Sequence, residues 1–215
     1  MTVSSPKHPI FERFYGWISP RMDQGGVHAH RRQLLAGLSG RVIEVGSGNG
    51  LNFAQYPSEV SRVLAVEPSP HLRELARDNA EGAPVPVEVV DGVAEHLPAD
   101  DETFEAAVVS LVLCSVPDQR KALREIHRVL RPGGGLHFYE HVRGDTPALQ
   151  RVQRLVDATI WPLLAGGCHT SRDTSAAITN AGFEMQRVDR LRFPDSVVSM
   201  PSSPHILGVA VRPSG

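Results

Sequence analysis

Residues 41–52 read RVIEVGSGNGLN, a short apolar run that breaks into alternating glycines. Glu44 stands near the end of the run, and Gly46, Gly48 and Gly50 follow it. Apolar residues bounded by glycine predict a buried strand that turns sharply into the next element. Glycines permit positive φ and let a ligand come close to the backbone. The stretch therefore predicts a strand, a tight turn and a nucleotide-type pocket in succession.

The glycine spacing narrows the kind of nucleotide. It is G-x-G-x-G with an acid two residues before the first glycine, whereas dinucleotide binders show G-x-G-x-x-G. This spacing argues against a nicotinamide-dependent dehydrogenase. A purely structural glycine turn is the alternative, and both the acid and the preceding strand count against it.

A second strand also ends in an acid. Residues 62–67 read RVLAVE, and Glu67 lies 21 residues past Gly46. A carboxylate at the end of the second strand can accept hydrogen bonds from ribose hydroxyls in nucleotide-binding sheets. A surface glutamate at a strand end is the alternative interpretation.

The bulk composition indicates a single globular domain. The chain has 215 residues, 22 Lys plus Arg against 24 Asp plus Glu, and a formal charge of −2. This balance gives no reason to expect a nucleic-acid partner. The two cysteines suit a reducing compartment, and no run approaches the roughly 18 apolar residues of a membrane span. Because the N-terminus also lacks the pattern of a signal peptide, we expect a soluble cytoplasmic protein.

The rest of the chain alternates between strand and helix patterns. Further strands are expected at residues 85–90, 103–111, 136–140, 183–191 and 206–211, and helices at 70–79, 119–130, 149–164 and 174–180. Pro162 interrupts the third of these helices. Such alternation implies right-handed crossovers and a parallel, doubly wound sheet.

The N-terminal part has its own pattern. Residues 10–18 carry an aromatic cluster typical of a short amphipathic helix, and residues 24–38 predict another helix. We interpret the basic and imidazole side chains inside the second helix as a solvated face; they are His28, His30, Arg31 and Arg32. We expect one domain over residues 1–215, in which residues 1–39 form a helical cap over the active site.

These features, in this order, resemble a class I S-adenosylmethionine-dependent methyltransferase over essentially the whole chain. Residues 44–50 resemble its motif I, Glu67 its ribose acid, and residues 91–95 (DGVAE) its adenine loop. Residues 128–135 (RVLRPGGG) resemble the turn before strand five in the ubiquinone-biosynthesis-like branch. The resemblance implies a Rossmann-like, doubly wound α/β sheet of seven strands, mostly parallel with an antiparallel C-terminal strand, and helices on both faces.

A finer resemblance rests on less generic stretches. They are GLNFAQYP (50–57), LVLCSV (111–116), EHV (140–142), GCHTSR (167–172) and PHILGVAV (204–211). Together they resemble the alkyl thiol S-methyltransferases, whose animal members carry an N-terminal membrane segment that we do not find here. The similarity runs from about residue 40 to the end. It implies methylation of a thiol or hydrosulfide and says little about residues 1–39.

The resemblance also implies the cofactor contacts. The residues expected to bind S-adenosylmethionine are Glu44, Gly46, Ser47, Gly48, Gly50, Asn52, Glu67, Pro68, Gly92, Val93, Ala94, Leu111 and Tyr15. The glycines would pack against the amino-acid part of the cofactor and Glu67 would hold the ribose. Asn52 would lie near the cofactor's carboxylate and Tyr15 would fold over it. Because Val93 stands where the branch more often has Asp, contact with adenine is expected from the Ala94 backbone.

Candidate acceptor-side residues follow the fifth strand. Glu140 and His141 are the expected catalytic residues, because they stand at the edge of the sheet where ligands bind. An imidazole can take a proton near neutral pH, and a thiol needs only modest help to react. The expected substrate-binding residues are Cys168, His169, Arg172 and His205. Each histidine could instead be a structural, hydrogen-bonded residue. By its position in the family, Arg172 is expected to fix its loop by pairing with a carboxylate, for which Glu140 is the candidate.

The cysteines give no sequence signal for a metal. Neither lies in a C-x-x-C pair and no His/Cys spacing fits a zinc site, so no metal is expected. We interpret Cys114 as a small buried hydrophobe. Packing is also the first interpretation of Cys168, and a place in the acceptor pocket is the second.

The expected function is transfer of a methyl group from S-adenosylmethionine to a small, mostly apolar acceptor, leaving S-adenosylhomocysteine. A thiol or hydrosulfide acceptor is favoured. The alternatives are O-, N- or C-methylation of a quinone-like or secondary metabolite and, from another class, a non-catalytic S-adenosylmethionine-binding regulatory protein. The sequence does not set the oligomeric state.

Overall fold

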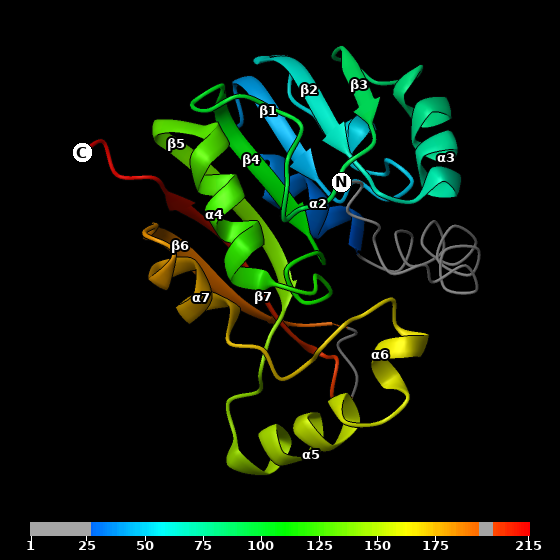
Figure 1. Ribbon diagram of the computed structural model, residues 1–215, viewed down its shortest axis with the longest axis vertical. Helices are drawn as coiled ribbons and strands as arrows, with labels where there is room; N and C mark the ends of the chain where they lie inside the picture. The colour runs from blue at the N-terminus through cyan, green and yellow to red at the C-terminus, as the bar shows by residue number, and fades with distance from the viewer. Residues whose placement is uncertain (1–26, 194–199) are drawn as a thin grey trace.

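The computed structural model describes residues 27–193 and 200–215, and these residues form one seven-stranded sheet (Figure 1). The strand order is β3-β2-β1-β4-β5-β7-β6. The strands are β1 (Gly40–Val45), β2 (Val60–Val66), β3 (Val87–Val90), β4 (Phe104–Ser110), β5 (Leu130–His141), β6 (Glu184–Arg192) and β7 (Pro204–Val211). β7 runs antiparallel to both β5 and β6, and the other pairings are parallel. The expected doubly wound sheet with an antiparallel C-terminal strand is confirmed.

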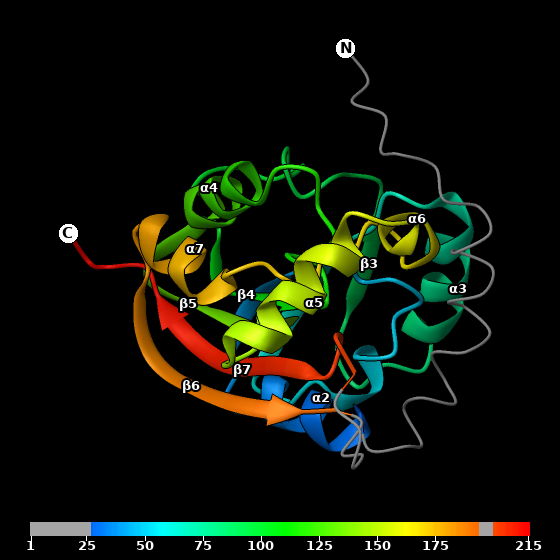
Figure 2. The same ribbon diagram turned by 90° about the horizontal axis from the view of Figure 1, so that it is seen from below.

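Helices cover both faces of this sheet. They are α2 (His28–Leu35), the 3-10 helix η2 (Phe53–Gln55), α3 (Pro70–Ala80), α4 (Gln119–Val129), α5 (Pro147–Asp157), α6 (Trp161–Leu164) and α7 (Thr174–Asn180). Figure 2 shows α4 and α7 on one side of the sheet and α2 on the other. The strand order reverses between β1 and β4, and in such sheets ligands bind outside the carboxyl ends of the strands at that point.

The core has two layers because neighbouring side chains of a strand point to opposite faces. Ile43 packs in the layer shared with α4 and α7, whereas Val42 packs in the layer shared with α2 and α3. On α4, the fully buried stripe consists of Ala122, Leu123, Ile126 and Val129. Asp118 caps this helix by accepting a hydrogen bond from the Lys121 N–H. The amphipathic pattern of the sequence therefore settles which face of α4 meets the sheet.

Two elements differ from the expectation. The strand expected at residues 136–140 begins at Leu130, and residues 131–135 form an irregular part of β5 in place of a turn. The C-terminal segment holds them there, because the Gly133 N–H donates to the Arg212 carbonyl and the Arg212 N–H donates to the Gly134 carbonyl. The helix expected at 149–164 is two helices, since Pro162 occupies the first turn of a new one, α6.

The N-terminal expectations are tested only in part. The helix expected at residues 24–38 is present as α2. The helix at residues 10–18, Tyr15 and most of the expected cap lie outside the described residues.

Candidate active site

The glycine turn follows β1 at the switch point. Gly46, Gly48 and Gly50 have φ values of +69°, +57° and +80°, a region that other residues rarely adopt. Space is also restricted, because a Cβ on Gly46 would lie 2.6 Å from Cγ2 of Val112, and one on Gly50 would lie 2.5 Å from Cε2 of Phe53. The turn predicted from the sequence is confirmed, and glycine is required there by both conformation and packing.

Glu67 ties this turn to the end of β2. Its Oε2 accepts a hydrogen bond from the Gly48 N–H at 2.9 Å and its Oε1 accepts one from the Ser69 N–H at 2.9 Å. The side chain is buried. These N–H groups fix the orientation of the carboxylate, which offers about four acceptor positions in all.

Glu44 links the end of β1 to the residues that follow the glycine turn. Its carboxylate is buried and accepts hydrogen bonds from Asn52 Nδ2 and from Tyr56 Oη, both at 2.7 Å. Arg31 Nη1 donates to Asn52 Oδ1 at 2.8 Å and so extends the network to α2. Burial raises the pKa of Glu44 to about 7, against the hydrogen bonds from Tyr56 and Asn52, which lower it. Glu44 and Asn52 are thus in contact, and both carboxylate oxygens of Glu44 are hydrogen-bonded to other side chains of the protein.

Arg31 and Tyr56 are two members of this network that the sequence analysis missed. The prediction of a solvated face is wrong for Arg31, since the residue is buried. A signal was present, because Arg31 lies four residues after Val27 and three before Leu34, on the inward stripe of the helix. Tyr56 lay within one of the family-like stretches without any assigned role.

The expected adenine loop closes over the end of β2. A Cβ on Gly92 would lie 2.8 Å from Cγ1 of Val66, so the loop packs tightly against that strand. Val93 pairs with His96 in an isolated bridge, and Ala94 is buried. Arg73 Nη1 anchors the loop by donating to Asp91 Oδ1 at 2.6 Å and to the carbonyls of Glu67 and Pro68.

The residues after β4 form a strained turn. Leu111 has a φ of +61°, which for a non-glycine residue costs about 1–3 kcal/mol and is often found at functional sites. The next three residues are held by Glu140, whose carboxylate accepts the N–H groups of Val112, Leu113 and Cys114 at 2.9, 3.0 and 3.1 Å. The three hydrogen bonds to Glu140 therefore stabilise the turn that contains the strained Leu111.

The Glu140 carboxylate is enclosed by the fold and bonded to the turn after β4. It is fully buried, and burial raises its pKa to about 7 against the N–H groups of Leu113, Val112 and Cys114, which lower it. Arg172 does not pair with it, which corrects the expected contact; Arg172 Nη1 donates to the Leu113 carbonyl at 2.6 Å. In this geometry Glu140 holds the turn after β4, and its expected catalytic role stays a prediction.

His141 and the two cysteines meet beside this turn. His141 Nδ1 lies 3.7 Å from Cys114 Sγ and 3.4 Å from Cys168 Sγ. Both cysteines are buried and free, while His141 is half-buried. The hydrogen bond from Cys114 and the contact with His141 lower the pKa of Cys168, whereas that same hydrogen bond and burial raise the pKa of Cys114. Cys114 is buried as expected, but it also takes part in a polar cluster.

His205 lies behind His141, with ring centroids 4.3 Å apart. Its Nδ1 lies 2.8 Å from the Ser203 carbonyl, and its ring stacks on Tyr139 at 5.0 Å. Burial lowers the pKa of His205 to about 3, so the imidazole is neutral and its Nδ1–H donates to Ser203. His30 also packs on Tyr139, at 5.4 Å, and is half-buried.

The loop at residues 166–172 brings Cys168 and His169 to the site. Asp157, on α5, accepts hydrogen bonds from the N–H and hydroxyl groups of Thr170 and Ser171. The His169 N–H donates to the Cys114 carbonyl at 2.8 Å, and His169 Nδ1 bonds the Gly167 carbonyl at 2.7 Å. The loop is therefore fixed against the turn after β4 by backbone contacts.

The residues at the switch point fit a nucleoside cofactor with an amino-acid tail. Among the described residues, the buried hydroxyl of Ser47 has no hydrogen-bond partner, which is costly unless a ligand supplies one. It lies inside the positive-φ glycine turn, where exposed backbone can approach such a ligand. The cofactor would be bound jointly by Glu67, by Ser47 and by the backbone of the turn.

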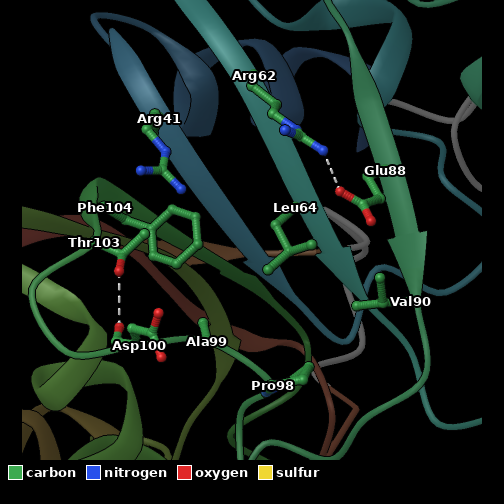
Figure 3. A pocket seen from close by; sticks show the side chains of 10 residues that line it. All are labelled: Arg41, Arg62, Leu64, Glu88, Val90, Pro98, Ala99, Asp100, Thr103 and Phe104. Atoms are coloured by element: carbon green, nitrogen blue, oxygen red, sulfur yellow. Dashed lines mark hydrogen bonds and ion pairs between the residues drawn. The ribbon is translucent and has the colours of Figure 1, made fainter.

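Two hollows lie elsewhere on the surface. The larger, of about 300 Å³, lies across the starts of β1 and β4 and beside β2 and β3, away from the glycine turn (Figure 3). Ten residues line it: Arg41, Arg62, Leu64, Glu88, Val90, Pro98, Ala99, Asp100, Thr103 and Phe104. The smaller, of about 260 Å³, reaches His205 from the side of Leu149 and Leu191. Only the second adjoins the acceptor side.

Comparisons with known proteins agree with this geometry. A methyltransferase domain family matches residues 43–138. The S-adenosylmethionine-dependent methyltransferase of Thermotoga maritima, described as a possible histamine N-methyltransferase, superposes with a TM-score of 0.69 at 24% identity, covering 94% of this chain and 98% of that one. The [4+2]-cyclase SpnF superposes with a TM-score of 0.71 at 19% identity, covering 100% and 99%, so this likeness shows the fold alone. The fold and the site define a class I S-adenosylmethionine-dependent methyltransferase.

Sequence relatives specify the family. Human thiol S-methyltransferase TMT1B is 36% identical over 183 residues, which cover 83% of this chain and 74% of the relative. Human thiol S-methyltransferase TMT1A is 36% identical over 186 residues, covering 84% and 75%. The chain belongs to the thiol S-methyltransferase family. Within residues 27–193 and 200–215, no helix has the length and apolar character needed to cross a membrane.

Proposed function

We propose that this protein transfers a methyl group from S-adenosylmethionine to the sulfur of a small, mostly apolar thiol. The observation that carries the proposal is the chemistry of the acceptor side. The Glu140 carboxylate is occupied by three N–H groups, and His205 is neutral and buried. These two groups therefore give little help to a phenol or an alcohol, and His141 is left as the one expected base on the acceptor side. A thiol is partly ionised at neutral pH and intrinsically nucleophilic, so it needs little help.

The residues of the switch point would hold the methyl donor. We assign the turn at residues 46–50 and the Ser47 hydroxyl to the amino-acid part, Glu67 to the ribose, and residues 92–94 with Leu111 to the adenine. The cofactor, when bound, supplies a methyl group on a sulfonium that leaves as a neutral thioether. The protein's contribution is then mainly to position the two reactants, which can supply effective molarities of about 10⁵–10⁸ M.

On the acceptor side, His141 assists the loss of the thiol proton. It is half-buried and stands at the carboxyl end of β5, next to the turn that Glu140 supports. Glu140 is a positioning residue in this proposal, and His205 packs behind His141 and restricts its ring. Because both cysteines are buried and free, we extend the proposal to action in a reducing compartment such as the cytoplasm.

The test is a substrate panel. The full chain is incubated with S-adenosylmethionine and matched alkyl thiols, phenols and amines, and the thioether, ether or amine products are measured. Thioether formation from the alkyl thiols is expected. Methylation of phenols or amines with the thiols inert would overturn the sulfur assignment, and cofactor binding without turnover of any acceptor would indicate a regulatory binding protein.

A further inference from the structure

Three soft donor atoms converge from three distant parts of the chain. Cys114 comes from the turn after β4, His141 from the end of β5, and Cys168 from the loop after α6. Their donor atoms, two Sγ and one Nδ1, all lie within 4.8 Å of one another. Local spacing could not reveal this cluster, because each donor lies 27 residues from the next.

The distances fit a tetrahedral metal ion. With Zn–S near 2.3 Å and Zn–N near 2.0–2.1 Å, the sulfur-to-nitrogen edge of a tetrahedral site is about 3.6 Å. The two measured edges, from His141 Nδ1 to the sulfur atoms, are 3.7 and 3.4 Å. A disulfide between Cys114 and Cys168 would give no reason for both sulfur atoms to face one imidazole nitrogen, whereas a shared cation does.

The donors are held in place by contacts that do not involve them. The Cys114 N–H is fixed by Glu140, and the Cys114 carbonyl accepts the N–H of His169, the neighbour of Cys168. His141 pairs with His205 in the ladder between β5 and β7. Because the backbone is already ordered, a cation would meet a largely preformed site, which lowers the entropic cost of binding.

Charge also favours a divalent ion here. Two thiolates and a neutral imidazole around a dication give a complex of zero net charge. Zero net charge suits these buried residues, since burying an uncompensated charge is costly. Soft sulfur and imidazole donors select zinc-like ions over magnesium or calcium. Three protein ligands with a fourth position open is the arrangement of catalytic zinc sites.

We propose that Cys114, His141 and Cys168 bind a thiophilic divalent cation, Zn²⁺ in the first instance, with the acceptor sulfur as its fourth ligand. The assignment of the fourth ligand rests on the proposed function, whereas the site itself does not. On binding, each cysteine thiol releases its proton to solvent and forms a sulfur–metal bond. An acceptor thiol does the same at the fourth position. With the cation bound, Nδ1 of His141 is a metal ligand and takes no proton, and the cation assists the acceptor thiol in losing its proton to solvent.

The first experiment measures the site without any activity assay. The reduced full chain is stripped with a chelator and titrated with Zn²⁺ by calorimetry, then with Co²⁺ in a spectrophotometer. One equivalent is expected, with tetrahedral Co²⁺ bands and a thiolate-to-cobalt charge-transfer band. Cys114→Ser and Cys168→Ser should each weaken Zn²⁺ binding at least about 100-fold, since even outer-shell partners are worth about 10–100-fold.

A matched control separates this site from surface imidazoles. His141→Ala should weaken Zn²⁺ binding and alter the d–d bands of the Co²⁺ form, while His71→Ala, at an exposed histidine, should bind Zn²⁺ as the parent does. Circular dichroism of each variant checks folding. The proposal is overturned if the reduced parent binds no stoichiometric Zn²⁺, or if the cysteine variants bind it equally well. Recovery of a Cys114–Cys168 disulfide from chelator-free protein with no bound metal would also overturn it.

The second experiment tests the fourth ligand. Adding an alkyl thiol to the Co²⁺ form, without S-adenosylmethionine, should strengthen the charge-transfer band, and a matched alcohol should not. An unchanged spectrum would overturn the fourth-ligand assignment. Full thiol methylation by metal-free protein would overturn the cation's role in binding the acceptor and would leave the proposed function standing. Methylation of phenols alone would overturn the proposed function and the fourth-ligand assignment but leave the cation site standing, because the Zn²⁺ titration is independent of the acceptor.

Discussion

The carboxylate of Glu140 accepts the Leu113 N–H at 3.0 Å, across 27 residues of sequence. This contact joins the end of β5 to the turn after β4, and the same carboxylate also holds the amide of Cys114. The acceptor side is thus built on one buried acid. The strained Leu111 backbone on one side and the His141 cluster on the other both depend on it.

Removing this charge should destabilise the fold. Glu140→Gln offers one carbonyl oxygen to three N–H groups and turns an amide donor toward them, leaving buried donors unpaired. We expect the free energy of unfolding to fall by about 2–4 kcal/mol. Urea unfolding measures it, with the half-exposed Glu88→Gln as control, expected to stay within about 0.5 kcal/mol of the parent. Equal stability of the two variants would contradict the positioning role.

Glu44→Gln should change how stability depends on pH. Burial raises the pKa of Glu44 to about 7 in the folded protein, against 4.5 ordinarily. Between those values the folded state keeps a proton that the unfolded chain has lost, so stability falls as pH rises through that window. Glutamine removes this loss. The free energy of unfolding of the variant, measured relative to that of the parent, should therefore rise by up to about 3 kcal/mol between a pH below 4.5 and pH 8.

Urea unfolding of the parent and of Glu44→Gln across this pH range tests the slope. The constant offset from altered hydrogen bonds to Asn52 and Tyr56 does not matter, since only the change with pH is compared. Any other titrating group contributes equally to both proteins. Parallel curves would show that Glu44 ionises in the folded protein as it does in water.

Gly46→Ala should damage the turn more than its φ alone explains. The new Cβ would lie 2.6 Å from Val112, in addition to the cost of φ +69°. Gly37→Ala is the matched control, because Gly37 has φ +77° and no atom within 4 Å of the added Cβ. We expect Gly37→Ala to cost about 1–2 kcal/mol of stability and to keep cofactor binding. Gly46→Ala should cost more and weaken cofactor binding at least tenfold by calorimetry, and equal effects would contradict the close packing.

Glu67→Ala should weaken binding of S-adenosylmethionine by about 10–150-fold, since a hydrogen bond to a charged group is worth about 1.5–3 kcal/mol. Calorimetry with S-adenosylhomocysteine gives the same comparison without turnover. Glu88→Ala, one strand away on β3, is the control and should bind as the parent does. Unchanged affinity in Glu67→Ala would remove Glu67 from the cofactor site.

Local patterns in the sequence predicted most of the fold. The strand and turn at residues 41–50 were readable because apolar periodicity and glycine act over a few residues, and α7 was placed residue for residue by its own pattern. The extension of β5 was not readable, because residues 131–135 join the sheet only through the C-terminal segment. The burial of Arg31 was readable from its helical spacing, but its hydrogen bond to Asn52 was not, since Asn52 lies 21 residues away.

The sequence by itself determined the sheet, the methyl-donor turn and the family, because these depend on short-range patterns that the chain carries in continuous stretches. Only the tertiary structure decided which neighbours each expected acceptor-side residue has. It bonded the Glu140 carboxylate to three N–H groups, made His205 neutral by burial, and brought Cys114, His141 and Cys168 together. The physical reason is that hydrogen-bond capacity, desolvation and metal geometry are set by neighbours in space, and those neighbours come from three separate segments of the chain.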